Sequence, residues 1–162
     1  MISIGDKIPD FALTNIDREQ MNSDDFLGEK TMFVFIPFPF SGVCTPEACE
    51  LRDNKDFLDK ASMNTVIITI SGVATNITWA SQYEIDFPIL SDFWPHGEVA
   101  QMFGCFNDKV GTAMRYSYIT NEENIVTDIV KSDELTVGRD INEYKESIGS
   151  YPTSLTSDSS IL

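Results

Sequence analysis

The run Thr31-Met32-Phe33-Val34-Phe35-Ile36 leads directly into Pro37-Phe38-Pro39-Phe40-Ser41-Gly42-Val43-Cys44-Thr45-Pro46-Glu47. The first six residues form a short, almost continuous apolar run, which is typical of a central strand covered on both faces. Pro37 and Pro39 stop this strand, and residues 45–58 have the apolar spacing of a helix with a proline at its start. The sequence therefore predicts a buried strand, a tight loop and a helix, with Cys44 where the loop meets the helix.

Strand and helix signals alternate along the rest of the chain. Apolar and β-branched runs predict strands at 65–70, 87–90, 116–119 and 125–130, and spaced apolar residues predict helices at 75–83, 98–103 and 140–148. A loop leading into a short strand is expected over 5–13, and a turn or one helical turn within 21–30. The last two strands should form an antiparallel hairpin. This order predicts an α/β fold with a central mixed β-sheet flanked by helices on both faces, compatible with a thioredoxin-like fold.

The length of 162 residues is that of one domain with its own core. We expect this domain to occupy residues 1–148, and the Ser/Thr-rich residues 149–162 to form a flexible tail. Apolar runs fall short of the roughly 20 residues that cross a bilayer, and the first residues lack the pattern of a secretory signal. We therefore expect a soluble, cytoplasmic protein without a membrane partner.

The charge of the chain is strongly negative, with 11 Lys and Arg against 26 Asp and Glu and a formal net charge of -15. Such a surface repels phosphate backbones, so we expect no nucleic-acid partner. Solubility is the simplest explanation of the acidity, and a saline habitat or a basic partner protein are alternatives.

Cys44 is the residue whose predicted position has the most specific chemistry. The first N–H groups of a helix have no partner inside the helix and the helix dipole is positive there, so an anion such as a thiolate is stabilised. Helix N-termini and nearby cations can lower the pKa of a thiol from about 8.5 to roughly 3.5–7.5. Cys44 is therefore a candidate nucleophile, and the alternative is a small buried apolar residue.

The residues around Cys44 also resemble a known family. Pro37, Ser41 and Cys44 fit the pattern Pro-x-x-x-(Thr/Ser)-x-x-Cys of the peroxiredoxins, and Glu47 stands where that family has a Glu. Residues 44–53 resemble the Q-type, bacterioferritin-comigratory subgroup, whereas residues 87–97 resemble the alkyl hydroperoxide reductase E subgroup. The similarity runs from about residue 5 to residue 148, and it implies the thioredoxin-like fold.

The resemblance implies a thiol-dependent peroxidase that acts on hydrogen peroxide and organic hydroperoxides. The Cys44 thiolate would attack the terminal peroxide oxygen and become a sulfenic acid. The Ser41 hydroxyl would hydrogen-bond the thiolate and the peroxide. Arg115, which cannot lose its proton, would keep the thiolate ionised and polarise the peroxide; the alternative for Arg115 is a surface ion pair. We expect neither a cofactor nor a metal ion.

The same resemblance implies supporting roles for further residues. Glu47 would orient the arginine, Pro37 would shield the sulfur from water, and the backbone N–H groups of Val43 and Cys44 would stabilise charge in the transition state. The aromatic residues Phe38, Phe40 and Trp94 either create an apolar surround that accepts organic peroxides or belong to the core.

Cys49 is the candidate resolving cysteine, because it lies five positions after Cys44, which is the spacing of the resolving cysteine in many Q-type relatives. On one intact helix the two Cα atoms lie roughly 8–9 Å apart, whereas a disulfide needs about 4.4–6.8 Å. The first helical turns would therefore have to unwind, and Pro46 would make that less costly. Alternatively, an external thiol reduces Cys44 directly; thioredoxin, glutaredoxin or a low-molecular-weight thiol are the expected reductants, and the protein is expected to be a monomer or homodimer.

Other functions are less consistent with the sequence. Zinc could bind Cys44, Cys49, Cys105 and the single His96, but the spacings match no compact zinc knuckle. A Cys/His hydrolase would rest on His96 alone, and a thioredoxin-type oxidoreductase would need Cys-x-x-Cys. A scaffold that has kept only the fold would not need intact active-site positions. Cys105 lies among aromatic residues and is expected to be structural.

Overall fold

The computed structural model describes residues 1–149 of the chain. Within this range a seven-stranded sheet has the order β2-β1-β5-β4-β3-β8-β9, and a two-stranded hairpin pairs β6 with β7. The elements are β1 (Ala12–Thr14), β2 (Gln20–Asn22), the 3-10 helix η1 (Ser23–Phe26), β3 (Lys30–Phe35), α1 (Cys44–Asp53), α2 (Lys55–Lys60), β4 (Met63–Thr69), α3 (Val73–Tyr83), β5 (Ile89–Ser91), α4 (Glu98–Phe103), β6 (Phe106–Asn107), β7 (Thr112–Ala113), β8 (Arg115–Thr120), β9 (Val126–Ser132) and α5 (Ile141–Gly149).

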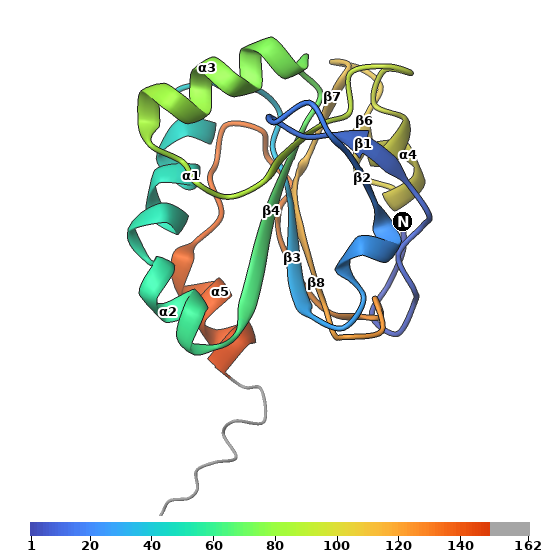
Figure 1. Cartoon of the computed structure of the whole chain (residues 1–162), viewed down its shortest axis with the longest axis vertical. Coiled ribbons are helices and arrows are strands. Elements are labelled where there is room, and N and C mark those ends of the chain that lie inside the picture. The colour runs from blue at the N-terminus through green and yellow to red at the C-terminus, as the bar shows by residue number, and fades with distance from the viewer. Residues whose placement is uncertain (150–162) are drawn as a thin grey trace, which may run out of the picture.

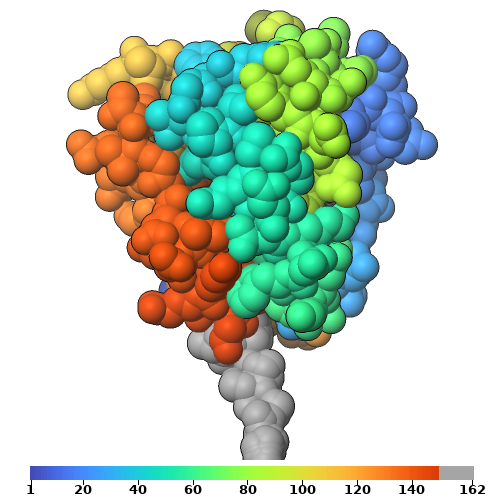
Figure 2. Space-filling model, turned by 90° about the vertical axis from the view of Figure 1, so that its left-hand side faces the viewer, coloured from blue at the N-terminus to red at the C-terminus, as the bar shows by residue number. Residues whose placement is uncertain are grey.

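Helices cover both faces of the sheet, as predicted. Helices α1, α2, α3 and α5 lie on one face, and α4 lies on the other (Figure 1). Figure 2 looks onto the first face, where these four helices form one continuous surface. Alternate residues of β3 enter the two cores, because Val34 packs on the α1 side and Phe33 and Phe35 pack on the α4 side. The prediction of a central strand buried on both faces is therefore confirmed.

Strand direction determines which loops meet at one edge of the sheet. Strands β3, β4 and β5 are parallel, whereas β8 runs antiparallel to β3 and β9 antiparallel to β8. The start of β8 and the end of β9 therefore lie at the same edge as the end of β3. Because α1 begins at this edge, the loop after β3, the first residue of β8 and the loop after β9 converge around Cys44.

The single helix predicted over 45–58 is wrong in one respect. The chain breaks at Asn54 into α1 and α2, where the backbone has φ -104° and ψ 21°. The Asn54 side chain donates to the backbone oxygen of Glu50 at 2.8 Å, and Asn side chains often compete in this way with regular helical hydrogen bonds.

Other differences are small. The hairpin of β6 and β7 and the strand β2 were not predicted, because strands of two or three residues are too short to show a period. Gly149 belongs to α5 and not to the predicted tail; the remainder of that tail, 150–162, lies outside the described residues. The proposed domain boundary stays a prediction. Among residues 1–149, no helix combines the length and the apolar character needed to cross a bilayer.

Candidate active site

Cys44 is the first residue of α1, and its side chain is completely buried. Its sulfur faces two donors: Arg115 Nη1 lies 3.0 Å from Sγ, and the backbone N–H of Phe38 lies 3.5 Å from it. The strand-to-helix position was predicted, and the donor from Phe38 was not. These contacts give the sulfur one full positive charge and one amide dipole, which both favour an anionic sulfur.

The loop between β3 and α1 makes this position possible. Pro37 and Pro39 are buried and supply no N–H for further strand pairing. Phe40 has a left-handed backbone, with φ 65°, which is uncommon for a residue with a side chain. The loop thus turns sharply and returns the chain to the sheet edge.

The side chain of Ser41 lies at the site but makes a different contact from the one predicted. Its Oγ accepts the backbone N–H of Cys44 at 2.8 Å, which leaves the hydroxyl proton available to another acceptor. The N–H of Cys44 is therefore already used inside the loop. The predicted role of that N–H in stabilising the transition state does not fit this geometry, and the N–H of Phe38 is the donor that faces the sulfur.

Arg115, Glu47 and Arg139 form a buried ionic network beside the sulfur. Arg115 Nη1 donates to Glu47 Oε1 at 2.7 Å, and Arg115 Nε donates to the backbone oxygen of Leu135 at 2.6 Å. Arg139 donates to Glu47 through its backbone N, Nε and Nη2, at 2.6–3.0 Å. The alternative of a surface ion pair for Arg115 is excluded, because the Arg115 side chain is only 3% exposed.

This network carries a net positive charge when the Cys44 sulfur is not counted. In the described part of the chain it contains two guanidinium groups and the one carboxylate of Glu47. Burial opposes ionisation of Glu47, but the hydrogen bonds and charge of Arg139, with a smaller contribution from Arg115, hold the pKa of Glu47 below its ordinary value of 4.5. With Glu47 ionised, the network keeps one net positive charge, which a Cys44 thiolate would neutralise.

Arg139 is the member of this network that the sequence analysis missed. It lies just before α5 and 92 residues from Glu47 in the chain. The available signal was the scarcity of basic residues, 11 in a chain of 162, which makes any arginine next to a predicted turn a candidate partner for a buried acid.

A cavity of about 250 Å³ opens beside the sulfur. Three of its lining residues, Phe38, Ser41 and Arg115, contact Cys44 directly. The lining is mostly apolar and consists of Pro37, Phe38, Ser41, Gly42, Val43, Val110, Thr112, Arg115, Leu135 and Thr136. The cavity therefore combines polar groups of Ser41 and Arg115 that contact Cys44 with a mostly apolar wall.

The three aromatic residues expected near the site separate in the structure. Phe38 lines the cavity. Phe40 instead packs edge-on against Tyr83 with ring centroids 6.2 Å apart, and Trp94 is 82% exposed. Neither of these two is among the described residues that line the cavity, and neither belongs to the core.

Comparison with known proteins assigns the family. The sequence pattern of the AhpC/TSA family matches residues 4–129. The chain belongs to the AhpC/TSA family. This membership confirms the predicted peroxiredoxin resemblance, and with it the class of activity, a thiol-dependent peroxidase.

Individual members of the AhpC/TSA family show the same relationship. The chain is 33% identical to "Alkyl hydroperoxide reductase E" of Mycobacterium tuberculosis over 127 residues, which cover 78% of this chain and 83% of that protein. It is 33% identical to "Peroxiredoxin Bcp" of Escherichia coli over 108 residues, which cover 67% and 68%. The structure of Enterococcus faecalis AhpC superposes with a TM-score of 0.86 at 23% identity, covering 98% of both chains. At that identity the superposition shows the fold alone, and it confirms the predicted thioredoxin-like fold.

The second cysteine of this AhpC/TSA protein lies on the same helix as the first. Cys49 is half-buried in α1, and both thiols are free. Five helical positions turn a side chain by about 140° around the axis, so Cys44 and Cys49 lie on different sides of an intact helix. A disulfide between them requires α1 to unwind, as expected from the sequence; the resolving role of Cys49 stays a prediction.

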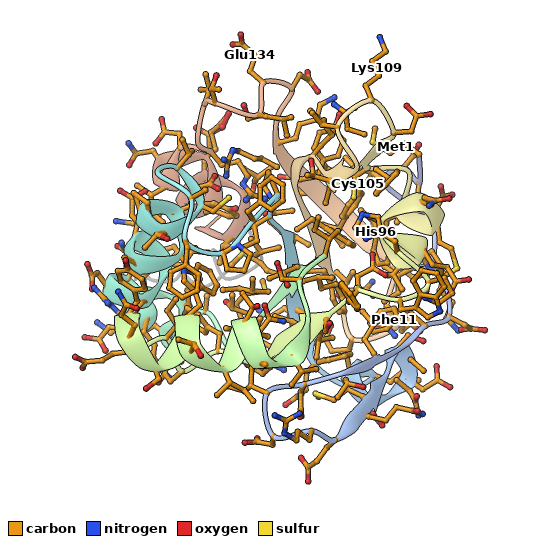
Figure 3. All side chains as sticks on the ribbon, turned by 90° about the horizontal axis from the view of Figure 1, so that it is seen from above. Met1, Phe11, His96, Cys105, Lys109 and Glu134 are labelled. Carbon is orange, nitrogen blue, oxygen red and sulfur yellow. The ribbon has the colours of Figure 1, made fainter. Side chains whose placement is uncertain are left out.

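The remaining cysteine and the histidine lie away from Cys44. Figure 3 shows Cys105 and His96 on the α4 side of the sheet, whereas α1 covers the other side. Burial raises the pKa of the Cys105 thiol, and the exposed His96 contacts the Gly111 backbone oxygen through Nε2 at 2.7 Å. Among residues 1–149, no three His, Cys, Asp or Glu side chains are grouped to hold a metal ion, so the zinc alternative finds no support.

Proposed function

We propose that Cys44 is the peroxidatic nucleophile of this thiol-dependent peroxidase. The observation that carries the proposal is the contact of 3.0 Å between Arg115 Nη1 and Cys44 Sγ inside a buried network with a net positive charge. The thiolate attacks the terminal oxygen of a hydroperoxide, so that an S–O bond forms while the O–O bond breaks. The sulfur loses two electrons, and the departing alkoxide or hydroxide takes a proton and leaves as alcohol or water.

Each residue at the site has a role in this step. Arg115 holds the sulfur anionic and stabilises charge on the peroxide oxygens, and Glu47 and Arg139 hold Arg115 in place. The Ser41 hydroxyl donates its proton to the bound peroxide, since its oxygen accepts from the backbone and its proton is left available. Pro37 and the backbone of Val43 shape the wall of the cavity and keep water from the sulfur.

We propose that organic hydroperoxides with an apolar substituent are substrates alongside hydrogen peroxide. The apolar part of the cavity lining includes Phe38, Val110 and Leu135, and these can bury an apolar group at about 25 cal/mol per Å². Val110 is 57% exposed, so Val110→Ser should slow oxidation by cumene hydroperoxide and leave oxidation by hydrogen peroxide unchanged. Val137→Ser, at a residue that is 48% exposed, is the matched control. Equal rates for Val110→Ser and Val137→Ser with cumene hydroperoxide would contradict the proposed substrate class.

The fate of the sulfenic acid is the second part of the proposal. Once α1 unwinds, the Cys49 sulfur attacks the sulfur of the Cys44 sulfenic acid, so that an S–S bond forms while the S–O bond breaks and water leaves. Thioredoxin, glutaredoxin or a low-molecular-weight thiol then reduces the disulfide. Without Cys49, the same external thiols would attack Cys44 directly. The oligomeric state, monomer or homodimer, and the cytoplasmic location stay predictions.

One experiment tests both parts. Reduced protein is mixed with one equivalent of hydrogen peroxide, and the products of wild type, Cys44→Ser and Cys49→Ser are identified by mass spectrometry. We expect a Cys44–Cys49 disulfide in wild type and a sulfenic acid in Cys49→Ser. A stable sulfenic acid in wild type would assign reduction to an external thiol. A wild type that reacts no faster than Cys44→Ser would refute the role of Cys44.

A further inference from the structure

Arg139 has a second set of contacts, which leads away from Cys44 to the last helix. Its Nη1 donates to Ser117 Oγ at 3.0 Å, and Ser117 Oγ lies 2.6 Å from the hydroxyl of Tyr144. Ser117 follows Arg115 by two positions on β8 and so points to the same face of the sheet. Tyr144 belongs to α5. One continuous line of contacts therefore connects α5 to the sulfur through Ser117, Arg139, Glu47 and Arg115.

All members of this line are removed from water. Ser117 is 0% exposed, Tyr144 is 4% exposed and Arg139 is 5% exposed. Burial raises the pKa of Tyr144, so its hydroxyl keeps its proton at neutral pH. Hydrogen bonds in such surroundings are stronger than in water, and a buried group that loses its partner is costly. The position of the Arg139 guanidinium thus depends on the Ser117–Tyr144 pair as well as on Glu47.

We propose that Tyr144 is a positioning residue for the peroxidatic site: it holds Ser117, and through it Arg139 and Glu47, so that Arg115 stays aligned with the Cys44 sulfur. This inference rests on the proposed role of Cys44. Helix α5 lies outside the family match at residues 4–129. Through Tyr144 this helix contributes to the reactivity of the site as well as covering the sheet.

The chain offers a matched control in Tyr118. This residue is also a buried tyrosine, 0% exposed, and its hydroxyl donates to the backbone oxygen of Phe103 at 3.2 Å. It follows Ser117 directly on β8 and therefore points to the opposite face, toward α4. Tyr118→Phe removes a buried hydroxyl of the same kind without touching the line to Cys44.

The test measures the rate at which one hydroperoxide oxidises Cys44 in the full-length protein. Wild type, Tyr144→Phe, Ser117→Ala, the double variant and Tyr118→Phe are reduced and mixed with cumene hydroperoxide across a range of pH, and the sulfenic acid is trapped and quantified. We expect Tyr144→Phe and Ser117→Ala each to slow oxidation about fivefold at neutral pH. Their pH–rate profiles should move to more alkaline pH, because a displaced Arg115 stabilises the thiolate less well.

The double variant should be no slower than the slower single variant, since both act through the same contact. Tyr118→Phe should retain the wild-type rate and profile. Wild-type rates and profiles in both Tyr144→Phe and Ser117→Ala, in a wild type that itself reacts rapidly, would overturn the inference and leave the role of Cys44 standing. A wild type no faster than Cys44→Ser would instead refute the proposed function.

Discussion

Replacing Glu47 by Gln tests the charge balance on which the site depends. The carboxylate of Glu47 accepts one hydrogen bond from Arg115 and three from Arg139, which fills its acceptor capacity. Gln has nearly the same shape, but one oxygen becomes an NH₂ group that faces the donors of an arginine. The variant therefore leaves two buried guanidinium groups without a counter-charge on that side chain.

The expected cost follows from the burial of the group. The Glu47 side chain is 9% exposed, and removal of one partner from a buried ion pair costs about 3–5 kcal/mol. The free energy of unfolding of a domain of ordinary stability is about 5–15 kcal/mol, so the variant should still fold. At this chain length, 1 kcal/mol shifts the melting temperature by about 2–4 °C, so a loss of about 3–5 kcal/mol should lower it by roughly 6–20 °C.

The assay is urea unfolding of wild type, Glu47→Gln and the control Glu50→Gln as a function of pH. Glu50 is exposed on the same helix, so its variant should stay within about 0.5 kcal/mol of wild type. The native pKa of Glu47 lies below its ordinary 4.5, so its contribution to stability is complete above that pH and is lost as pH falls through the native pKa. Two results would refute this reasoning. One is a decrease in the free energy of unfolding that is as small in Glu47→Gln as in Glu50→Gln. The other is a decrease in Glu47→Gln that stays the same at acidic pH.

Three further predictions concern other buried groups of the protein. Burial raises the pKa of Asp92 from 3.8 to about 6, so stability should decrease as pH rises through that window, and Asp92→Asn should remove this slope in urea unfolding. Trp79 Nε1 donates to Thr45 Oγ1 at 3.1 Å, so a disulfide that unwinds the first turns of α1 should expose Trp79 and shift its fluorescence to the red; an unshifted spectrum would show that α1 stays wound. Burial raises the pKa of the Cys105 thiol, whereas the equally buried Cys44 sulfur lies 3.0 Å from the Arg115 guanidinium, which lines a cavity. When native protein is alkylated at neutral pH, Cys105 should therefore stay unmodified while Cys44 reacts, as peptide mass spectrometry would report.

The local elements of this fold were predictable because their signals lie within short segments. The continuous apolar runs predicted β3 and β4, and the residues that separate two strand patterns predicted the hairpin of β8 and β9. The break at Asn54 and the two-residue strands β6 and β7 escaped prediction. The break depends on a single side-chain contact, and the two short strands depend on pairing between segments. Neither feature produces a periodic pattern of apolar residues in the sequence.

The sequence by itself determined the position of Cys44, because a cysteine between a buried strand and a helix start meets the positive end of the helix whatever else surrounds it. It also identified Arg115 and Glu47, through family resemblance. Only the tertiary structure decided which groups complete the network. Arg139 reaches Glu47 across 92 residues of chain, and Tyr144 joins through Ser117 because α5 packs on that face of the sheet. Such contacts arise from strand order and helix packing, which bring together residues that are distant in the sequence. No local sequence pattern predicts them.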